Sequence, residues 1–303
     1  MELEFKNAIG NYIEEMPCLP TSSLMALEVC NNYFTSSGDL VKLVSLDPVI
    51  YGRLLFLANS VYPQEEQPIG SSERAIIKLG MNTVKNLIVS MVEHKTNWTS
   101  EKDGHINDGL DMINFWRHCL CVGITARLLA QKKGEDLRTA ERYFTAGFLH
   151  DIGKIPLNGI MKSQYILVLD SAREGQRSLH NEESRSFGFN HCCSGSFINK
   201  AWRLDNYIGD AIMYHHSSDD YEGEYRDLVQ CIAAANQFAS CSGIGFSGTT
   251  GADGSSAENM EKLGIKPDLF NDIRNTVLKE MENAEFFLKI DEAAGRGTSC
   301  MSG

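Results

Sequence analysis

Apolar residues recur every three or four positions through the first part of the chain, from Leu3 to Val92, which is the spacing of amphipathic helices. The alternation of apolar and polar residues that marks a β-strand is scarce there. Asp47 and Pro48 predict the start of one helix, because an Asp side chain accepts hydrogen bonds from backbone N–H groups and proline fixes the first helical residue. The pattern therefore predicts about five or six short helices joined by short loops.

A second helix start is expected at Ser71 and Ser72, whose hydroxyl groups can cap backbone N–H groups in the same way. Glycine disfavours the helical conformation, so Gly80 should interrupt this helix before the pattern continues from Met81 to Val92. Residues 97 to 110 are polar, contain glycine and lack periodicity. They predict a connection between this half and a second helical half.

The second half opens with a periodic segment from Asp111 to Lys133, and Gly134 provides a natural stop. His118 falls on the apolar stripe of this segment, so its side chain should point inward. The next helix, Leu137 to His150, ends where a histidine and an aspartate are neighbours in the chain. Gly153 is expected to turn the chain just after them.

Asn206 to His216 has apolar residues at steps of four, which aims His216 along the apolar face of a further helix. Ser242 to Ser256 is dominated by Gly, Ser and Thr and predicts a mobile loop, because it cannot bury enough apolar surface to offset the entropy lost on ordering. Helical periodicity resumes from Pro267 to Ile290, which should pack back on the second half. The residues after it predict a frayed tail.

The composition restricts the class of protein. The chain of 303 residues has a net charge of −12 and is 43% apolar, so it should form a sizeable core and should not bind nucleic acid through a broad basic face. Its 9 cysteines show no CxxC spacing, which predicts reduced and mostly buried thiols. The acidic start lacks the basic residues of a secretory signal, and no apolar run approaches the ~20 residues of a membrane span. We therefore expect a soluble, cytoplasmic protein without membrane contact.

The most informative residues are His150 and Asp151, because an adjacent imidazole and carboxylate can share one divalent cation, or the carboxylate can bridge two. A single histidine is most often a satisfied core or surface residue. Here several of the 8 histidines fall in the same part of the chain as Asp151, namely His118, His150, His191, His215 and His216. This clustering of ligand types favours a metal site.

Several segments of the chain occur together in a known family, in the same order: LPTSSLMALEVC, LVSLDPVIYGRLLFLANS, IGSSERAIIKLGMNTVKNLIVSMV, FWRHCL, AGFLHDIGKIPL, GFNHCCSG and MYHHS. Through them the chain resembles the bacterial HDOD signalling domain, and its second half resembles the HD superfamily of metal-dependent phosphohydrolases. The Leu-Ala-Asn-Ser and Leu-Gly segments of the first half are specific to the HDOD group. The resemblance spans about residues 15 to 240.

The resemblance implies an all-α fold in which an N-terminal helical subdomain precedes an HD-domain-like helical bundle. The predicted divisions are 1–100 for the N-terminal subdomain, 108–240 for the HD-like core, 242–258 for a flexible loop, 259–290 for C-terminal helices packed on the core, and 291–303 for a tail.

The resemblance also implies a nearly full set of metal ligands, whose last three members complete a second metal position as in the related HD-GYP phosphodiesterases: His118, His150, Asp151, His191, His215 and His216. Lys154 would be the base that faces a phosphate group, and Asp151 is the other catalytic candidate. Glu183, upstream of His191, would hydrogen-bond that ligand histidine, with a solvated helix carboxylate as the alternative interpretation. The cofactor would be one or two divalent ions of Fe, Mn or Zn.

The chain also departs from the superfamily pattern. The superfamily's last ligand is an Asp, and its equivalent in IAAANQFAS is Asn236, which the resemblance implies as the last metal ligand although its neutral amide binds a cation more weakly than a carboxylate does. Asn114 stands where some phosphodiesterases have a Glu before the first His. The Gly-Tyr-Pro signature after the His pair is replaced by SSDDYEGEY, whose acidic residues would repel a phosphodiester. Asn59 and Asp47 in the first half are explained by turn and cap roles.

These features predict a bacterial regulatory HDOD protein that keeps an HD-type metal site mainly as a structural or sensing element. Its helical surface would contact a signalling partner protein, and a phosphate-containing ligand is a further candidate. The alternative is an active metal-dependent phosphohydrolase that acts on a nucleotide or cyclic dinucleotide. A third hypothesis is a scaffold without metal, which is favoured if the histidines lie too far apart to share an ion. The resemblance itself names no substrate.

Overall fold

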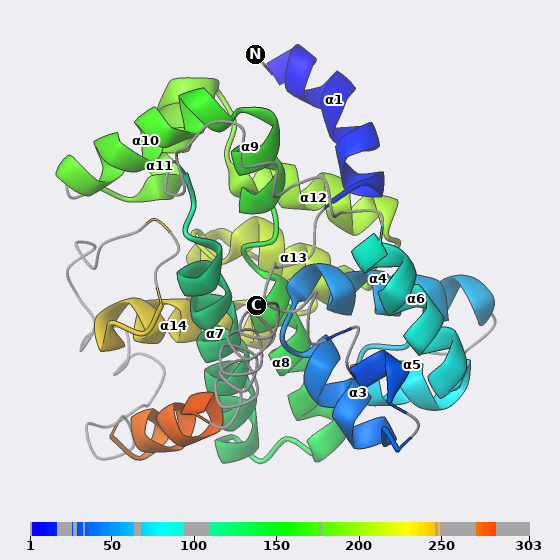
Figure 1. Ribbon diagram of the computed structural model, residues 1–303. Coiled ribbons are helices and arrows are strands. Elements are labelled where there is room, and N and C mark those ends of the chain that lie inside the picture. The colour runs from blue at the N-terminus through cyan, green and yellow to red at the C-terminus, as the bar shows by residue number, and fades with distance from the viewer. Residues whose placement is uncertain are drawn as a thin grey trace, which may run out of the picture.

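The computed structural model describes residues 2–16, 26, 29–32, 34–63, 68–93, 109–175, 177–245, 248 and 271–282. Every regular element in these residues is helical, as Figure 1 shows, which confirms the predicted all-α fold. The predicted connection at 97–110, the predicted loop at Ser242–Ser256 and the predicted tail fall largely or wholly outside these residues.

The first half contains a group of helices drawn in blue and cyan in Figure 1. They are α3 (Ser37–Val44), α4 (Pro48–Val61), α5 (Ser72–Leu79) and α6 (Met81–Glu93), which contact one another. The predicted helix starts are confirmed, because the Asp47 side chain caps α4 and the Ser71 hydroxyl caps α5. Gly80 separates α5 from α6 with a φ of 79°, a conformation that glycine adopts without strain.

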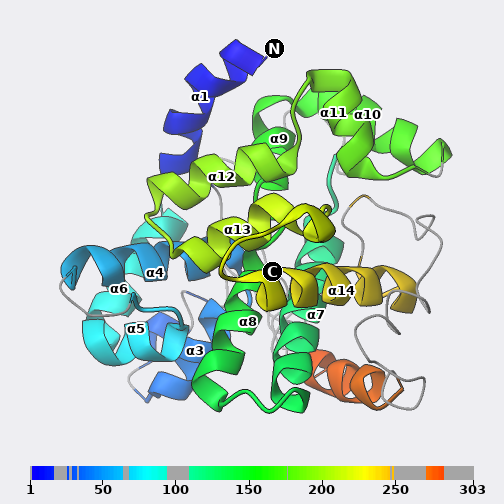
Figure 2. The ribbon, with the colours of Figure 1, turned by 180° about the vertical axis from the view of Figure 1, so that it is seen from behind.

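The first helix of the chain touches this group through Arg53 on α4, which donates a hydrogen bond to the Ile13 carbonyl oxygen at 2.7 Å, but its main packing is elsewhere. Helix α1 (Glu2–Glu14) packs against α9 (Lys154–Ile160) and α12 (His191–Ala201), and Figures 1 and 2 both show it at their end of the molecule. The ring centroids of Phe5 on α1 and Phe189, just before α12, are 4.8 Å apart. Helix α1 therefore covers the part of the second half from which α12 begins.

The second half is organised around two long helices, α7 (Met112–Lys132) and α8 (Leu137–Leu149), which agree with the predicted segments. Two glycines let them approach closely, because a Cβ on Gly147 would lie 3.0 Å from the Cα of Gly123. Helix α14 (Arg226–Ser242) packs on both. This packing holds the middle of α7 beside the end of α8.

Shorter helices complete the second half. They are α10 (Lys162–Glu174), α11 (Leu179–Phe187), α13 (Asn206–Tyr214), the 3-10 helix η1 (Ser218–Asp220) and a helix at 271–282. The helix at 271–282 buries Ile273, Val277 and Met281, and its Glu280 forms an ion pair with Arg127 on α7.

Besides the contact of α1 with α9 and α12, the two halves meet where α4 lies against α8. The Thr145 hydroxyl on α8 donates a hydrogen bond to the Gly70 carbonyl oxygen at 2.8 Å and lies 2.9 Å from the Tyr51 hydroxyl. Gly52 on α4 faces the Trp202 indole so closely that a Cβ there would lie 2.4 Å from Cζ3 of the ring. The joint therefore combines a short polar network with a tight contact between backbone and ring.

Within the described residues no helix has the length and apolar character needed to cross a membrane. Among the cysteines described there, Cys119, Cys121, Cys192 and Cys231 are buried, as the sequence predicted for most of the thiols.

Candidate metal centre

A cluster of histidines around Asp151 forms where several helices of the second half end or begin. His118 lies within α7, His150 caps α8 and precedes Asp151, His191 opens α12, and His215 and His216 follow α13. All of these side chains are buried except that of His216, which is half-buried. Their ligand atoms form two groups, and within each group the atoms lie within 4.8 Å of one another.

The first group contains His118, His150 and Asp151. The two Nε2 atoms are 3.4 Å apart, and Asp151 Oδ2 lies 3.6 Å from Nε2 of His118 and 3.3 Å from Nε2 of His150. Lys154 shares this space, because its Nζ lies 2.6 Å from the same carboxylate oxygen. A buried anion is thus surrounded by two imidazoles and an ammonium group.

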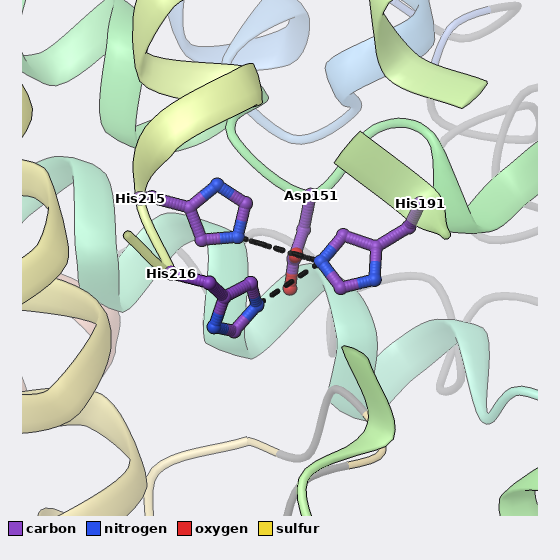
Figure 3. A group of neighbouring side chains, drawn as sticks. All are labelled: Asp151, His191, His215 and His216. Carbon is purple, nitrogen blue, oxygen red and sulfur yellow. Dashed lines mark hydrogen bonds and ion pairs between the residues drawn. The ribbon is translucent and has the colours of Figure 1, made fainter. Parts of the chain in front are cut away.

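The second group contains Asp151, His191, His215 and His216, which point toward one another in Figure 3. His191 Nε2 lies 3.4 Å from Nε2 of His215 and 3.1 Å from Nε2 of His216. The other carboxylate oxygen, Asp151 Oδ1, is 3.3 Å from His191 Nε2 and 3.6 Å from His215 Nε2. Asp151 therefore offers one oxygen to each group, as a carboxylate between two cations does.

Hydrogen bonds at the far side of the rings determine which nitrogen carries the hydrogen. His150 Nδ1 lies 2.7 Å from the Gly147 carbonyl oxygen, and His215 Nδ1 lies 3.0 Å from that of Ala211. A carbonyl oxygen can only accept, so in the neutral rings Nδ1 donates the hydrogen and Nε2 keeps a lone pair. These lone pairs point into the cluster, which is how metal-binding histidines present them.

Glu183 orients His191 in the same manner. Its Oε2 accepts hydrogen bonds from Nδ1 of His191 at 2.6 Å and from the backbone N–H of His191 at 2.8 Å, and its Oε1 accepts one from the Tyr165 hydroxyl at 2.7 Å. Burial acts to raise the pKa of Glu183, but the interaction with His191 lowers this pKa below its usual value. The predicted hydrogen bond is present, and a solvated carboxylate does not describe a side chain that is 0% exposed.

Burial and neighbouring charges together determine the charge of the cluster. Burial lowers the pKa of His118 and of His215 to about 3, and it lowers the pKa of His216 well below the usual value, so these rings are neutral near pH 7. Burial acts to raise the pKa of Asp151, but interactions with His150 and Lys154 hold this pKa well below its usual range. Neutral imidazoles beside an ionised carboxylate are in the protonation state that binds metal.

Two features of this donor set fit a divalent cation. Asp151 Oδ1 is buried and has no hydrogen-bond partner among the described residues, which is costly for an anionic oxygen. His191 and His215, whose Nδ1 atoms both donate to acceptors on the far side, face each other through their Nε2 lone pairs at 3.4 Å, an arrangement that is repulsive unless something positive lies between them. A cation bound by these atoms would satisfy the oxygen and remove the repulsion.

Two glycines bring the loop after Asp151 against the start of α12. A Cβ on Gly153 would lie 2.0 Å from the His191 carbonyl oxygen and 2.4 Å from the backbone nitrogen of Gly195. The φ of Gly153 is −67°, so glycine is needed here for the close approach and not for a left-handed conformation. The turn expected at Gly153 is therefore also the contact that places His191 beside Asp151.

Asn236 is not joined to the cluster by any hydrogen bond in the described part of the chain, and it lies half-buried on α14. Asn114, the other departure from the superfamily pattern, donates a side-chain hydrogen bond to Asp111 at the start of α7. Asn59 has the predicted turn role, because its amide exchanges two hydrogen bonds with the backbone of Ile69.

Two side chains beside the cluster, Tyr165 and His180, were not predicted from the sequence. The His180 ring centroid lies 4.7 Å from that of His216 and 5.8 Å from that of His191, and its Nε2 is 2.9 Å from the amide nitrogen of Asn190. Neither residue stands in a segment that carries the family resemblance. In the sequence, Tyr165 and His180 differ from ordinary residues of a helix only by their type, and this did not mark them as neighbours of the cluster.

Comparison with known proteins gives a family. The model of the HDOD domain family matches residues 16–218. An uncharacterized protein of Treponema pallidum (strain Nichols) is 23% identical over 230 residues, which cover 76% of this chain and 43% of that protein. The chain therefore spans less than half the length of this curated relative.

Solved structures share the fold. The MmoQ response regulator from Methylococcus capsulatus str. Bath is 16% identical with a TM-score of 0.63, and the match covers 86% of this chain and 97% of that chain. A virulence factor from Campylobacter jejuni subsp. jejuni is 18% identical with a TM-score of 0.65, and the match covers 92% of this chain and 98% of that chain. At these identities the likeness concerns the fold alone.

Proposed function

The chain belongs to the HDOD domain family, and on that basis we propose that it is a regulatory protein of a bacterial signalling pathway whose histidine cluster holds one or two divalent cations. The proposed ligands are His118, His150, Asp151, His191, His215 and His216. Imidazole and carboxylate donors of this kind suit Fe, Mn or Zn. The cation would tie together the helices that carry these residues, and the helical surface would contact a signalling partner protein.

The convergence of imidazole Nε2 atoms on both oxygens of Asp151 is the observation that carries this proposal. Hydrogen bonds from Nδ1 of His150, His191 and His215 keep these rings oriented toward Asp151. Ligands that are already oriented lose little conformational entropy on binding, so this arrangement favours tight binding of a cation.

The surroundings of the cluster favour a structural or sensing role over turnover. Asp151 is 0% exposed and Lys154 is 1% exposed, and the two form an ion pair of 2.6 Å with each other. A lysine held in this way is directed at Asp151 and not at an incoming phosphate. Asp219 and Asp220 are exposed in η1, shortly after His216, and their negative charge repels a phosphodiester.

Metal-dependent phosphohydrolysis is the second candidate function, because two donor groups that share Asp151 resemble the two-metal sites of phosphatases and nucleases. Cations bound there would supply Lewis acidity toward a phosphate ester. In that role Lys154 would exchange Asp151 for the substrate and neutralise charge on the phosphoryl group.

Metal content tests the proposed function. We expect the purified protein to carry a divalent cation in an amount close to one or two equivalents, measured by elemental mass spectrometry, and we expect His150→Ala to lose it. Leu54→Ala, which truncates a fully buried side chain in the first half, controls for general damage to the fold. Equal metal content in the wild-type and His150→Ala proteins would overturn the proposal.

A phosphodiesterase assay separates the two functions. With Mn²⁺ or Fe²⁺ present, the regulatory hypothesis expects no hydrolysis of nucleotides or cyclic dinucleotides. Metal-dependent turnover that disappears in His150→Ala would replace it with the hydrolase alternative.

A further inference from the structure

A polar cavity lies at the junction of the two halves, away from the histidine cluster. Its volume is about 240 Å³, and its walls come from the start of α5, from α8, from the start of α13 and from the turn before α14. None of the cluster residues lines it. Helix α8 runs from this cavity to His150, and its 13 residues span a length of about 20 Å.

Three arginines contribute to the walls of this junction cavity, Arg74 from α5 and Arg138 and Arg142 from α8. Arg138 and Arg142 are one helical turn apart and so lie on one face of α8. Asp205 and Glu224 are the acidic residues of the walls, so guanidinium groups outnumber carboxylates there although the chain as a whole has a net charge of −12. A local excess of arginine in an acidic protein favours an anionic ligand.

Aromatic rings hold one of these arginines in place. The guanidinium carbon of Arg142 lies 4.5 Å from the ring centroid of Tyr207 and 5.7 Å from that of Tyr225. Cation–π contacts of this kind fix the plane of the guanidinium group. The hydroxyl of Tyr207, which is fully buried, donates to the Gly70 carbonyl oxygen at 3.4 Å, so the same residue also links α13 to the first half.

The N-terminal ends of several helices meet at the junction cavity. Helices α13 and α14 each begin directly after a residue of its walls and have no side-chain cap at that end, whereas Ser71 caps α5 and Asp136 caps α8. The N–H groups at a helix N-terminus carry partial positive charge and are suited to phosphate oxygens. The guanidinium groups and these helix ends therefore both attract an anion to the junction cavity.

We propose that the junction cavity binds a small phosphate monoester, no larger than a mononucleotide, whose phosphate is held by Arg74 and Arg138. The volume of about 240 Å³ leaves room for a group beyond the phosphate, and the half-buried ring of Tyr225 offers it a flat apolar contact. Arginine suits this ligand because its planar fork makes two parallel hydrogen bonds to a phosphate.

The position of the cavity gives the ligand a role in joining the halves. Arg74 belongs to the first half, whereas Arg138 belongs to α8 in the second, so one phosphate would contact both. Helices α8 and α13 start at this cavity and end at His150 and His215 of the cluster. The binding site itself involves no cluster residue, so it does not depend on the proposed metal site.

Isothermal titration calorimetry tests the proposal with three probes, AMP, ribose 5-phosphate and inorganic phosphate, and with adenosine as the uncharged comparison. We expect AMP to bind and adenosine not to bind. Arg138→Gln and Arg74→Gln should each weaken AMP binding about tenfold or more, because each removes a charge-assisted hydrogen bond. Arg138 is exposed and Arg74 only half-buried, so Arg138→Gln keeps the test valid should Arg74→Gln fail to fold.

The control is Arg173→Gln, which removes the same charge from α10, where Arg173 pairs with Asp170 at 3.6 Å outside the cavity. The affinity of Arg173→Gln for AMP should equal that of the wild type, both measured on the protein as purified. Two outcomes would overturn the proposal: no binding by any phosphate probe, or equal affinities of Arg138→Gln and Arg173→Gln for AMP. Equal affinities would show that the phosphate binds outside the junction cavity.

Discussion

The carboxylate of Asp151 lies at the centre of the candidate site, within 3.6 Å of the side chains of both histidine groups. Its two oxygens face the two donor groups, and one of them also pairs with Lys154. A buried ammonium without its partner is strongly destabilising, so the carboxylate stabilises the fold as well as offering ligand atoms. Its position beside His150 in the chain is visible in the sequence, but its contact with His191 and His215 is not.

Glu183 gives a prediction at the same scale. We expect Glu183→Gln to weaken Mn²⁺ or Zn²⁺ binding about 10- to 100-fold, because partners that orient a ligand histidine have effects of this size. The glutamine amide has nearly the same volume as the glutamate carboxylate. It lacks the negative charge, and it replaces one of the two oxygens that accept hydrogen bonds from His191 and Tyr165 with an NH₂ group. Competition with a chelator measures the dissociation constant.

Glu182→Gln is the matched control for this prediction. Glu182 is also buried, with 3% exposure, but it pairs with Arg177 at 2.9 Å outside the cluster. Its substitution should leave metal affinity unchanged. If both variants bind metal equally well, Glu183 does not position His191.

At the scale of elements, the candidate site depends on how closely the loop after Asp151 approaches α12. We expect Gly153→Ala to lower the free energy of unfolding by about 1–3 kcal/mol, the usual cost of overpacking. The added Cβ would lie 2.0 Å from a backbone oxygen of His191, which cannot be relieved by turning a side chain. Urea denaturation measures the change.

The control for Gly153→Ala is Gly10→Ala on α1, where a Cβ would meet nothing within 4 Å. Alanine in place of glycine inside a helix should raise stability by about 0.5–1 kcal/mol. The change in the free energy of unfolding should therefore be negative for Gly153→Ala and positive for Gly10→Ala. A Gly153→Ala protein as stable as the wild type would contradict the close approach of the loop and α12.

At the scale of the whole molecule, the two halves are joined by the packing of α1 on α9 and α12, by the hydrogen bond from Thr145 to Gly70, and by the contact between Gly52 and Trp202. We expect Gly52→Ala to loosen this joint, because a Cβ there would lie 2.4 Å from the buried indole of Trp202. The expected result is a lower Tm and faster cleavage in limited proteolysis, with a loss of about 1–3 kcal/mol in the free energy of unfolding.

Gly38→Ala on α3 provides the comparison for the joint. Its Cβ would lie 3.6 Å from the Ser36 hydroxyl oxygen, an ordinary contact, so its Tm and its rate of cleavage should match those of the wild type or improve on them. Equal rates of cleavage in Gly52→Ala and Gly38→Ala proteins would show that the Gly52 contact does not hold the halves together.

Local features of the chain were predictable from the sequence because they arise from neighbours a few positions apart. The cap at Asp47, the break at Gly80 and the extent of α7 follow from hydrogen bonding and burial within one or two helical turns. The family segments added the set of histidines around Asp151. The division of the chain into domains and the roles of the ligand residues stay predictions.

The sequence by itself determined the helical class, the main helix boundaries and the residue types available for a metal site. Only the tertiary structure decided that Asp151 turns one oxygen to each histidine group, that Tyr165 lies behind Glu183, and that α1 packs on α12. These contacts join residues far apart in the chain, such as His118 and His150, which are separated by 32 positions. No periodic pattern encodes them, because they depend on how whole helices pack and on where glycine lets two backbones meet.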